Sequence, residues 1–420
     1  SVSNEINKMR FIDLFAGAGG FAEGFKRAGF EPVAHVEIDP AACFTLKTRL
    51  SYHYLKENNK LDIYIKYLKG EISRNLLYSV IPSCILESVI NLSIGNENNS
   101  KIFRIIEKLN SQKDIDIIVG GPPCQAYSVA GRSADKDRKR YDHRNYLYKQ
   151  YARFLAEFRP KLFVFENVPG LYTASDGTYY RNLKKYFKRI GYQVEDKIID
   201  AADFGVIQKR KRVIIIGWRK DVMFSYPDFE KLDNQWTVNS LLLDLPFLRN
   251  GDVRNQAKYR TKTNDYLEKF QIRNGVDFVT QNITRPHNKR DLEIYKRAIV
   301  LWEKENKRLK NSEIPEHIRT QKNVTSFLDR FKVVVLDDLS HTVIAHIAKD
   351  GHYYIHPDKE QLRSISIIEA ARIQSFPDDY FFEGSRTSAF RQIGNAVPPL
   401  MAESIAQKIK ALIENDAHNI

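Results

Sequence analysis

Short apolar runs alternate with longer amphipathic stretches through the first half of the chain. The runs predict buried β-strands, and they lie at 10–15, 33–38, 115–119, 162–165, 193–199 and 213–216. Helical patterns fill the intervals, notably at 146–158 and 180–190, and Pro40 suits the first turn of another helix. This alternation predicts an α/β fold with a doubly wound, mostly parallel sheet that helices cover on both faces.

The pattern changes after Gly217, and residues 221–341 are rich in Lys, Arg, Asn and Asp, with mixed strand and helix signals. We therefore expect a first domain over 1–220 and a second, smaller mixed domain with a hinge over 221–384. The stretch 363–373 has a helical pattern, and an amphipathic helix at 401–413 can return to the first domain, which segment 385–420 would complete. The long interval 62–110 predicts one or more inserted helices without recognisable chemistry.

Charge and cysteine content narrow the class of protein. The net charge of +14 favours a polyanionic partner, although a basic protein can also be merely soluble. No apolar run approaches the roughly 18 residues of a membrane span, and no signal pattern is visible, so we expect a cytoplasmic protein. The three cysteines, Cys43, Cys84 and Cys124, cannot pair completely and form no Cys-x-x-Cys. We therefore expect neither a disulfide framework nor a metal site.

A glycine-rich loop follows the first strand and opens a helix. Gly17, Gly19 and Ala22 fit the pattern G-x-G-x-x-A, and Glu37 stands at the end of the second strand. A carboxylate there can accept hydrogen bonds from ribose hydroxyls. The loop predicts a nucleoside-containing cofactor, either NAD or S-adenosylmethionine; the alternative is a simple tight turn.

Three further signals lie next to strands. Pro122 and Pro123 hold Cys124 on a stiff turn after the strand 115–119. Glu166 follows the strand 162–165, and an arginine-rich segment, 208–212, leads into the strand 213–216. Ligands of open α/β sheets bind at the carboxyl ends of the strands, so Cys124 and Glu166 should share an edge with the glycine-rich loop. Taken singly, each could be a buried thiol, a surface carboxylate or a solvated basic run.

These motifs resemble the DNA (cytosine-5) methyltransferase family, of the type found in prokaryotic restriction-modification systems. The resemblance rests on Pro-Pro-Cys-Gln at 122–125, Glu-Asn-Val at 166–168 and Gln-x-Arg-x-Arg at 208–212, and it extends to 11–25, 37–39, 363–380 and 391–399. It implies S-adenosylmethionine as the methyl donor, double-stranded DNA as the substrate and a flipped-out cytosine as the target base.

The resemblance also implies roles for individual residues. Cys124 would add to carbon 6 of cytosine, so that carbon 5 attacks the methyl group. Glu166 would contact ring nitrogen 3 and the exocyclic amine, and its pKa should be raised. Arg212 would bind the base's carbonyl oxygen, and Arg210 would help to hold the site and the sugar-phosphate. The cofactor would contact Phe15, Ala16, Gly17, Ala18, Gly19, Gly20, Glu37, Ile38, Pro122 and Asn395, with Glu71 and Ile72 near its adenine.

DNA binding is expected from two parts of the chain. Residues 128–144 would form a mobile catalytic loop that closes on DNA, and the expected DNA contacts are Gln125, Ser128, Arg132, Arg138 and Arg140. Residues 221–362 would form the target-recognition domain, with 285–290 and Thr342-Val343 as weaker candidates for contact. We expect a monomer in the prokaryotic cytosol, associated with the nucleoid, with a cognate restriction endonuclease as partner at the system level.

Three other functions stay open at this point. An NAD-dependent oxidoreductase would explain the glycine-rich loop and Glu37 but not the cysteine, glutamate and arginine motifs. An RNA cytosine-5 methyltransferase would share the catalytic residues, although the large basic segment before Arg363 favours a DNA reader. An inactive DNA-binding protein would not need Cys124, Glu166 and Arg212 together.

Overall fold

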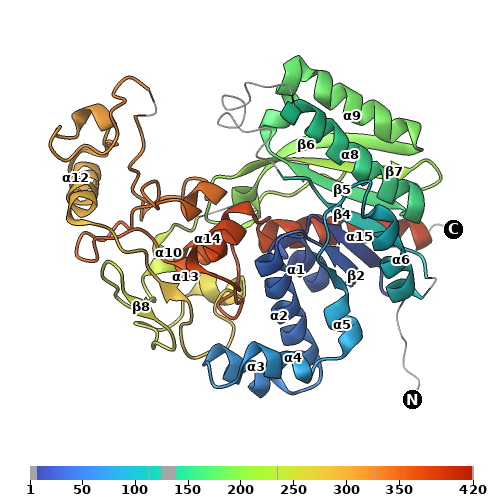
Figure 1. Ribbon diagram of the computed structural model, residues 1–420, viewed down its shortest axis with the longest axis horizontal. Helices are drawn as coiled ribbons and strands as arrows, with labels where there is room; N and C mark the ends of the chain where they lie inside the picture. Colours follow the sequence, from blue (N-terminus) through green and yellow to red (C-terminus); the bar gives the residue numbers. More distant parts are fainter. Residues whose placement is uncertain (1–6, 112, 124–138, 234, 327, 419–420) are drawn as a thin grey trace.

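The computed structural model describes residues 7–111, 113–123, 139–233, 235–326 and 328–418. A sheet region with helices on both faces lies beside a second region, which we define as residues 221–384; helix α12 marks the far end of that region (Figure 1). Among the described residues, no helix combines the length and the apolar character that crossing a bilayer requires.

Seven strands form the main sheet, in the order β3-β2-β1-β4-β5-β7-β6. Only β7 runs antiparallel to its neighbours, β5 and β6, so the expected α/β fold with a mostly parallel sheet is confirmed. The strands are β1 (Arg10–Leu14), β2 (Glu31–Val36), β3 (Val89–Ile90), β4 (Ile117–Gly120), β5 (Leu162–Asn167), β6 (Tyr192–Asp200) and β7 (Lys211–Arg219). Strand β3 was not predicted because two residues are too few to show a period.

The central strands are apolar on both faces because helices cover both. Ile12, Ile118 and Phe163 pack under α6 (Asn99–Asn110), α8 (Lys139–Phe158) and α9 (Thr178–Arg189). The alternate residues Phe11 and Ile117 pack under α1 (Gly20–Arg27) and α15 (Pro399–His418). Side chains of successive strand residues point to opposite faces, so one continuous apolar run serves both layers.

The predicted return of the C-terminal helix is confirmed. Helix α15 lies so close to α1 that a β-carbon on Gly24 would stand 2.4 Å from the Glu403 nitrogen. Helix α2 (Pro40–Glu57) begins as expected, with Pro40 in the first turn and the Asp39 carboxylate accepting the Ala41 N–H at 3.1 Å.

The insertion is helical, as predicted. It contains α3 (Leu61–Leu68), α4 (Arg74–Ser79) and α5 (Ser83–Glu87) before β3 and α6. Its aromatic cluster with α2 also includes Val276 and Phe278, so the insertion connects the sheet region to the second region.

The second region has short elements joined by irregular chain. They are α10 (Asn239–Leu242), β8 (Val253–Arg254), α11 (Asp265–Lys269), β9 (Asn282–Ile283), α12 (Lys289–Glu305) and α13 (Ile367–Ile373), and α14 (Arg386–Asn395) follows. The 3₁₀ turns of the chain are η2 (Pro169–Tyr172), η3 (Ala174–Gly177), η4 (Ala201–Phe204), η5 (Asn311–Glu313) and η6 (Ala345–Ala348).

Two predicted helices begin well away from the expected residue. Helix α13 begins at Ile367 rather than at 363, because Ser366 caps it in a reciprocal capping box with Glu369. Helix α8 begins at Lys139 rather than at 146, so residues 139–144 of the expected catalytic loop are helical.

Candidate active site

The glycine-rich loop turns sharply at the end of β1. Phe15 has a positive φ of 53°, which ends the strand one residue earlier than predicted. The Ala16 N–H donates to the Val36 carbonyl at 3.0 Å, and the Gly19 N–H donates to the Ala16 carbonyl at 3.1 Å. These bonds bring the loop beside the end of β2.

The glycines of this loop serve two different purposes. A β-carbon on Gly19 would lie 2.7 Å from the Tyr380 hydroxyl, and one on Gly20 would lie 1.8 Å from the Val397 carbonyl oxygen. These two glycines therefore permit close packing within the protein. A β-carbon on Gly17, in contrast, would meet no atom within 4 Å, so the backbone there is open to a ligand.

Glu37 and Ile38 lie beside this open backbone. The Glu37 carboxylate accepts the N–H groups of Gly17 at 2.9 Å and Asp39 at 2.7 Å. Burial raises the pKa of this carboxyl. Ile38 is 65 % exposed, which is unusual for a large apolar side chain, and it presents a surface on which a flat ring could pack.

Glu71 and Ile72 do not lie beside the glycine-rich loop, contrary to expectation. They follow α3, where the Glu71 N–H donates to the Lys66 carbonyl and Ile72 packs on the aromatic cluster of the insertion. Asn91 occupies the carboxyl end of β3 instead, and its amide donates to the carbonyls of Glu37 (3.1 Å) and Ile38 (2.8 Å). Sequence reasoning missed Asn91 because the short strand before it gave no signal.

The turn after β4 fits tightly between its neighbouring strands. Gly120 has φ 128°, and a β-carbon there would lie 1.9 Å from the Leu14 carbonyl oxygen. A β-carbon on Gly121 would lie 1.9 Å from the Glu166 carbonyl oxygen. The two glycines therefore let the chain that leads to buried Pro122 pass next to Glu166.

Several predicted residues fall beyond this turn. Cys124, Gln125, Ser128, Arg132 and Arg138 lie outside the described residues, and Arg140 belongs to α8 at a position whose side chain is not described. Of the other thiols, Cys84 is exposed, whereas Cys43 is buried and its pKa is raised to about 12 by burial. Cys43 is therefore a poor nucleophile.

Glu166 and Arg212 form an ion pair at the carboxyl end of β5. The Arg212 Nε lies 3.2 Å from a carboxylate oxygen of Glu166, and an Arg212 Nη donates to the Lys211 carbonyl at 2.7 Å. Burial raises the pKa of Glu166, and the charges of Arg212 and Arg210 oppose that rise only in part. This direction agrees with the raised pKa expected for a carboxyl that acts on the base.

Arg210 has a different environment from the one expected. Its buried guanidinium donates to the carbonyls of Val343 (2.5 Å), Gly394 (3.2 Å) and Ala396 (3.1 Å) and to the Gln208 side chain (3.2 Å). We expected Arg210 to help to hold both the site and the sugar-phosphate. Its bonds agree with the first role, and they give no support to the second. The bonds from Arg210 fix the backbone on both sides of Asn395, whose side chain is exposed. Val397, two residues further on, covers Gly20.

The two weaker DNA candidates also have defined partners. Arg285 is buried, and its guanidinium donates to the carbonyls of Ile347 (2.9 Å) and Ala348 (3.1 Å), so it serves the fold. Thr342 donates to the Lys209 carbonyl at 2.5 Å, and the Val343 N–H donates to the Gln208 side chain at 2.9 Å. The Thr-Val pair is thereby fixed to the arginine-rich segment.

Comparison with known proteins identifies the class. Residues 9–79 and 89–411 match the family model described as C-5 cytosine-specific DNA methylase, so the chain belongs to this family. It is 44 % identical to the type II methyltransferase M.Bpa9945I of Bacillus paralicheniformis, over 96 % of this chain and 99 % of that protein. It is 29 % identical to the type II methyltransferase M1.HphI of Haemophilus parahaemolyticus, over 97 % and 88 % of the two chains.

A solved structure shares the fold. It is described as a DNA modification methyltransferase encoded within a prophage of E. coli, with a TM-score of 0.64 and 23 % identity over 97 % of this chain and 100 % of that one. The strand order with antiparallel β7 also differs from the order 3-2-1-4-5-6 of NAD-binding domains. The protein is a DNA cytosine-5 methyltransferase that uses S-adenosylmethionine, and the oxidoreductase alternative is wrong.

Proposed function

We propose that the Cys124 thiolate attacks the target cytosine while Glu166 and Arg212 hold the base. The observation that carries this proposal is the Glu166–Arg212 pair, which stands directly beside the turn that leads to Cys124. Burial raises the pKa of the Glu166 carboxyl, which favours its protonated form and so the sharing of a proton with ring nitrogen 3.

The proposed reaction passes through a covalent adduct between the enzyme and the base. A bond forms between the Cys124 sulfur and carbon 6, while Glu166 supplies a proton toward nitrogen 3. Carbon 5 then takes the methyl group as the donor's sulfur–methyl bond breaks, so that S-adenosylhomocysteine leaves. A base removes the proton from carbon 5, the carbon 6–sulfur bond breaks to restore the thiolate, and ring nitrogen 3 returns its proton to Glu166, which restores the aromatic ring. In this scheme Arg212 orients the Glu166 carboxyl through its Nε and binds the carbonyl oxygen of the base.

The residues around Gly17 suit the methyl donor. When bound, S-adenosylmethionine supplies the methyl group as an electrophile. The open backbone at Gly17, the Glu37 carboxylate and exposed Ile38 offer a close approach, an acceptor for ribose hydroxyls and an apolar surface. We assign the contact near the adenine to Asn91 rather than to Glu71 and Ile72, because Asn91 fixes the Glu37-Ile38 backbone.

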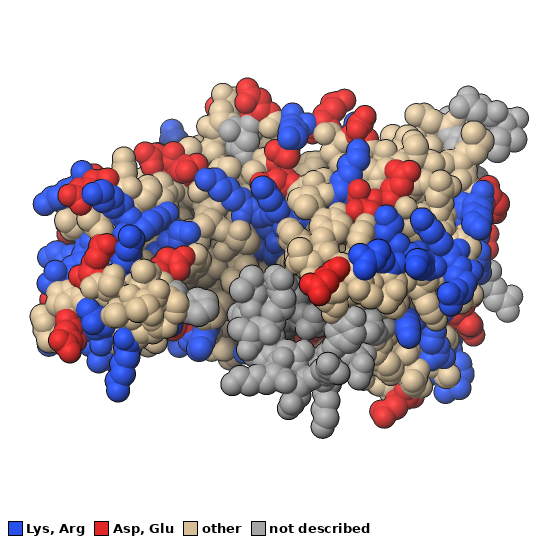
Figure 2. Space-filling model, turned by 90° about the horizontal axis from the view of Figure 1, so that it is seen from above, with Lys and Arg blue, Asp and Glu red and all other residues tan. Residues whose placement is uncertain are grey.

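We further propose that the second region reads a short DNA sequence and that the enzyme protects DNA against a cognate endonuclease. Lys and Arg side chains occur on both the sheet region and the second region of the face seen in Figure 2, as a phosphate-binding surface requires. Arg210 and Gln208 would couple DNA recognition to catalysis. They hold Val343 of the second region on one side and the Gly394–Ala396 backbone on the other.

Bisulfite sequencing of DNA from a host that expresses the protein tests this proposal. We expect 5-methylcytosine at one short sequence with wild-type enzyme and with Glu195→Gln, an exposed control on β6. We expect none with Cys124→Ser. Methylation that persists in Cys124→Ser would contradict the assigned nucleophile.

A further inference from the structure

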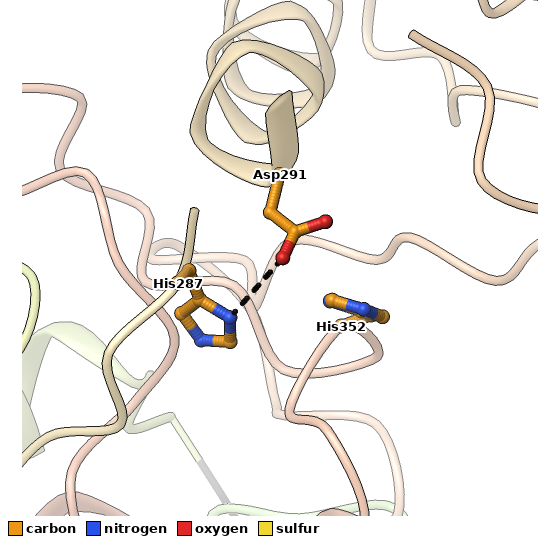
Figure 3. A group of neighbouring side chains, drawn as sticks. All are labelled: His287, Asp291 and His352. Carbon is orange, nitrogen blue, oxygen red and sulfur yellow. Dashed lines mark ion pairs between the residues drawn. The ribbon is translucent and has the colours of Figure 1, made fainter. Parts of the chain in front are cut away.

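Three potential metal ligands converge in the second region, apart from the Glu166 site. His287 precedes α12, Asp291 lies in its first turn, and His352 comes from a separate segment of the chain (Figure 3). One ligand atom from each residue lies within 4.8 Å of the other two. From the cysteine pattern we expected no metal site, and His287, Asp291 and His352 show no metal-binding motif in the sequence.

The local backbone fixes the three side chains before any ion binds. Asn288 caps α12 and accepts the Asp291 N–H at 2.8 Å, which sets the first turn of the helix. The Asp350 carboxylate accepts the His352 N–H at 3.0 Å, which sets the facing turn. The His287 Nδ1 then lies 3.8 Å from an Asp291 carboxylate oxygen. Donors of a tetrahedral zinc ion stand roughly 3.4 Å apart, given bonds of about 2.1 Å. Small rotations of the three side chains would bring their ligand atoms to this separation.

The surrounding hydrogen bonds also suit a metal. The Nε2 of His287 lies 2.8 Å from the Ser364 hydroxyl, which leaves Nδ1 directed toward Asp291; metal-binding histidines commonly have such a second partner. The Tyr295 hydroxyl lies 2.6 Å from the His352 Nδ1 and 3.3 Å from the His287 Nδ1. This buried hydroxyl therefore contacts both imidazoles of the group.

Two imidazole nitrogens and one carboxylate favour zinc over calcium or magnesium, which prefer sites built from oxygen.

We propose that His287, Asp291 and His352 bind a zinc ion that joins the start of α12 to the turn at 350–352. The ion is structural rather than catalytic, because the His287 and Asp291 side chains are only 3 % and 12 % exposed. It would hold together a region whose secondary-structure elements are short.

The test uses full-length protein without an affinity tag, dialysed against metal-free buffer and examined by elemental analysis. We expect about one zinc per chain for wild type and for His317→Ala, an exposed histidine of the same region, and almost none for His287→Ala. After chelation, added Zn²⁺ should raise the unfolding temperature of wild type, whereas Mg²⁺ should not.

If His287→Ala does not fold, Co²⁺ titration of chelated wild type gives the answer without a variant. Visible absorption typical of tetrahedral Co²⁺ would support the site. Wild type that retains no zinc and whose unfolding temperature ignores added Zn²⁺ would overturn the proposal, leaving a metal-free network of Tyr295, the two histidines and Asp291.

Discussion

Two glutamates, partly buried Glu166 in the sheet region and fully buried Glu369 in the second region, face arginines with opposite consequences. Glu166 meets Arg212 through a single Nε contact at 3.2 Å, and its pKa is raised by burial. Glu369 receives two Arg363 N–H groups at 2.7 and 3.0 Å and the Ser366 N–H at 2.7 Å, and its pKa is lowered well below the usual value.

The difference lies in the balance between burial and the neighbouring charges and hydrogen bonds. At Glu369, the charge and hydrogen bonds of Arg363, together with His356 at 3.4 Å, outweigh burial, so ionisation is favoured and the pair fixes the fold. At Glu166, burial outweighs the charges of Arg212 and Arg210, so the protonated form is favoured more than in a free glutamate. The sheet edge thus has a reactive pair, and the second region has a structural one.

The largest expected effect is on catalysis. Glu166→Gln should lower kcat by about 10²- to 10⁴-fold, because the amide cannot deliver a proton to the base. Its free energy of unfolding should remain close to that of wild type, since the variant removes a carboxyl that burial disfavours. Single-turnover methylation and urea unfolding measure the two quantities. A Glu166→Gln variant that is strongly destabilised but still active would contradict the catalytic role assigned to Glu166.

The matching change in the second region should have the opposite profile. Glu369→Gln leaves the fully buried Arg363 without its carboxylate, so the free energy of unfolding should fall by about 3–5 kcal/mol. Activity per folded molecule should change little at low temperature. Urea denaturation measures the loss, and Glu360→Gln, at an exposed position nearby, serves as the control.

Acid should remove the stabilisation that Glu369 provides to the folded protein. Glu369 has a depressed pKa when folded, so its stabilisation is fully present above the unfolded value of about 4.3 and is lost as the pH falls through the folded value. The stability difference between wild type and Glu369→Gln should therefore shrink as the pH falls below about 4.3. Unfolding curves over a pH series test this, and a constant difference would contradict it.

A smaller effect should follow from Arg212→Gln. The Arg212 charge lowers the pKa of Glu166, so its removal should raise that pKa further. The alkaline limb of the kcat/KM profile should then move to higher pH, while overall activity falls. A limb that stays in place would show that Glu166 does not govern it.

The sheet and the order of its motifs could be predicted from the sequence because buried parallel strands are apolar on both faces. Sequence reasoning placed Glu37 and Glu166 correctly at strand ends for the same reason. It could not place Asn91, since a two-residue strand has no detectable period, nor the partners of Arg210, which come from segments far along the chain. The convergence of His287 with His352 is likewise a product of tertiary structure.

The central claim is that the Cys124 sulfur bonds to carbon 6 of the target cytosine. Duplex DNA with 5-fluorocytosine at the methylated position tests it directly, because fluorine replaces the proton that must leave carbon 5 before the thiolate is released. With S-adenosylmethionine, wild-type protein should form a covalent adduct that survives denaturing electrophoresis, and the peptide joined to DNA should contain Cys124. An active enzyme that forms no adduct, or an adduct that persists in Cys124→Ser, would contradict the account.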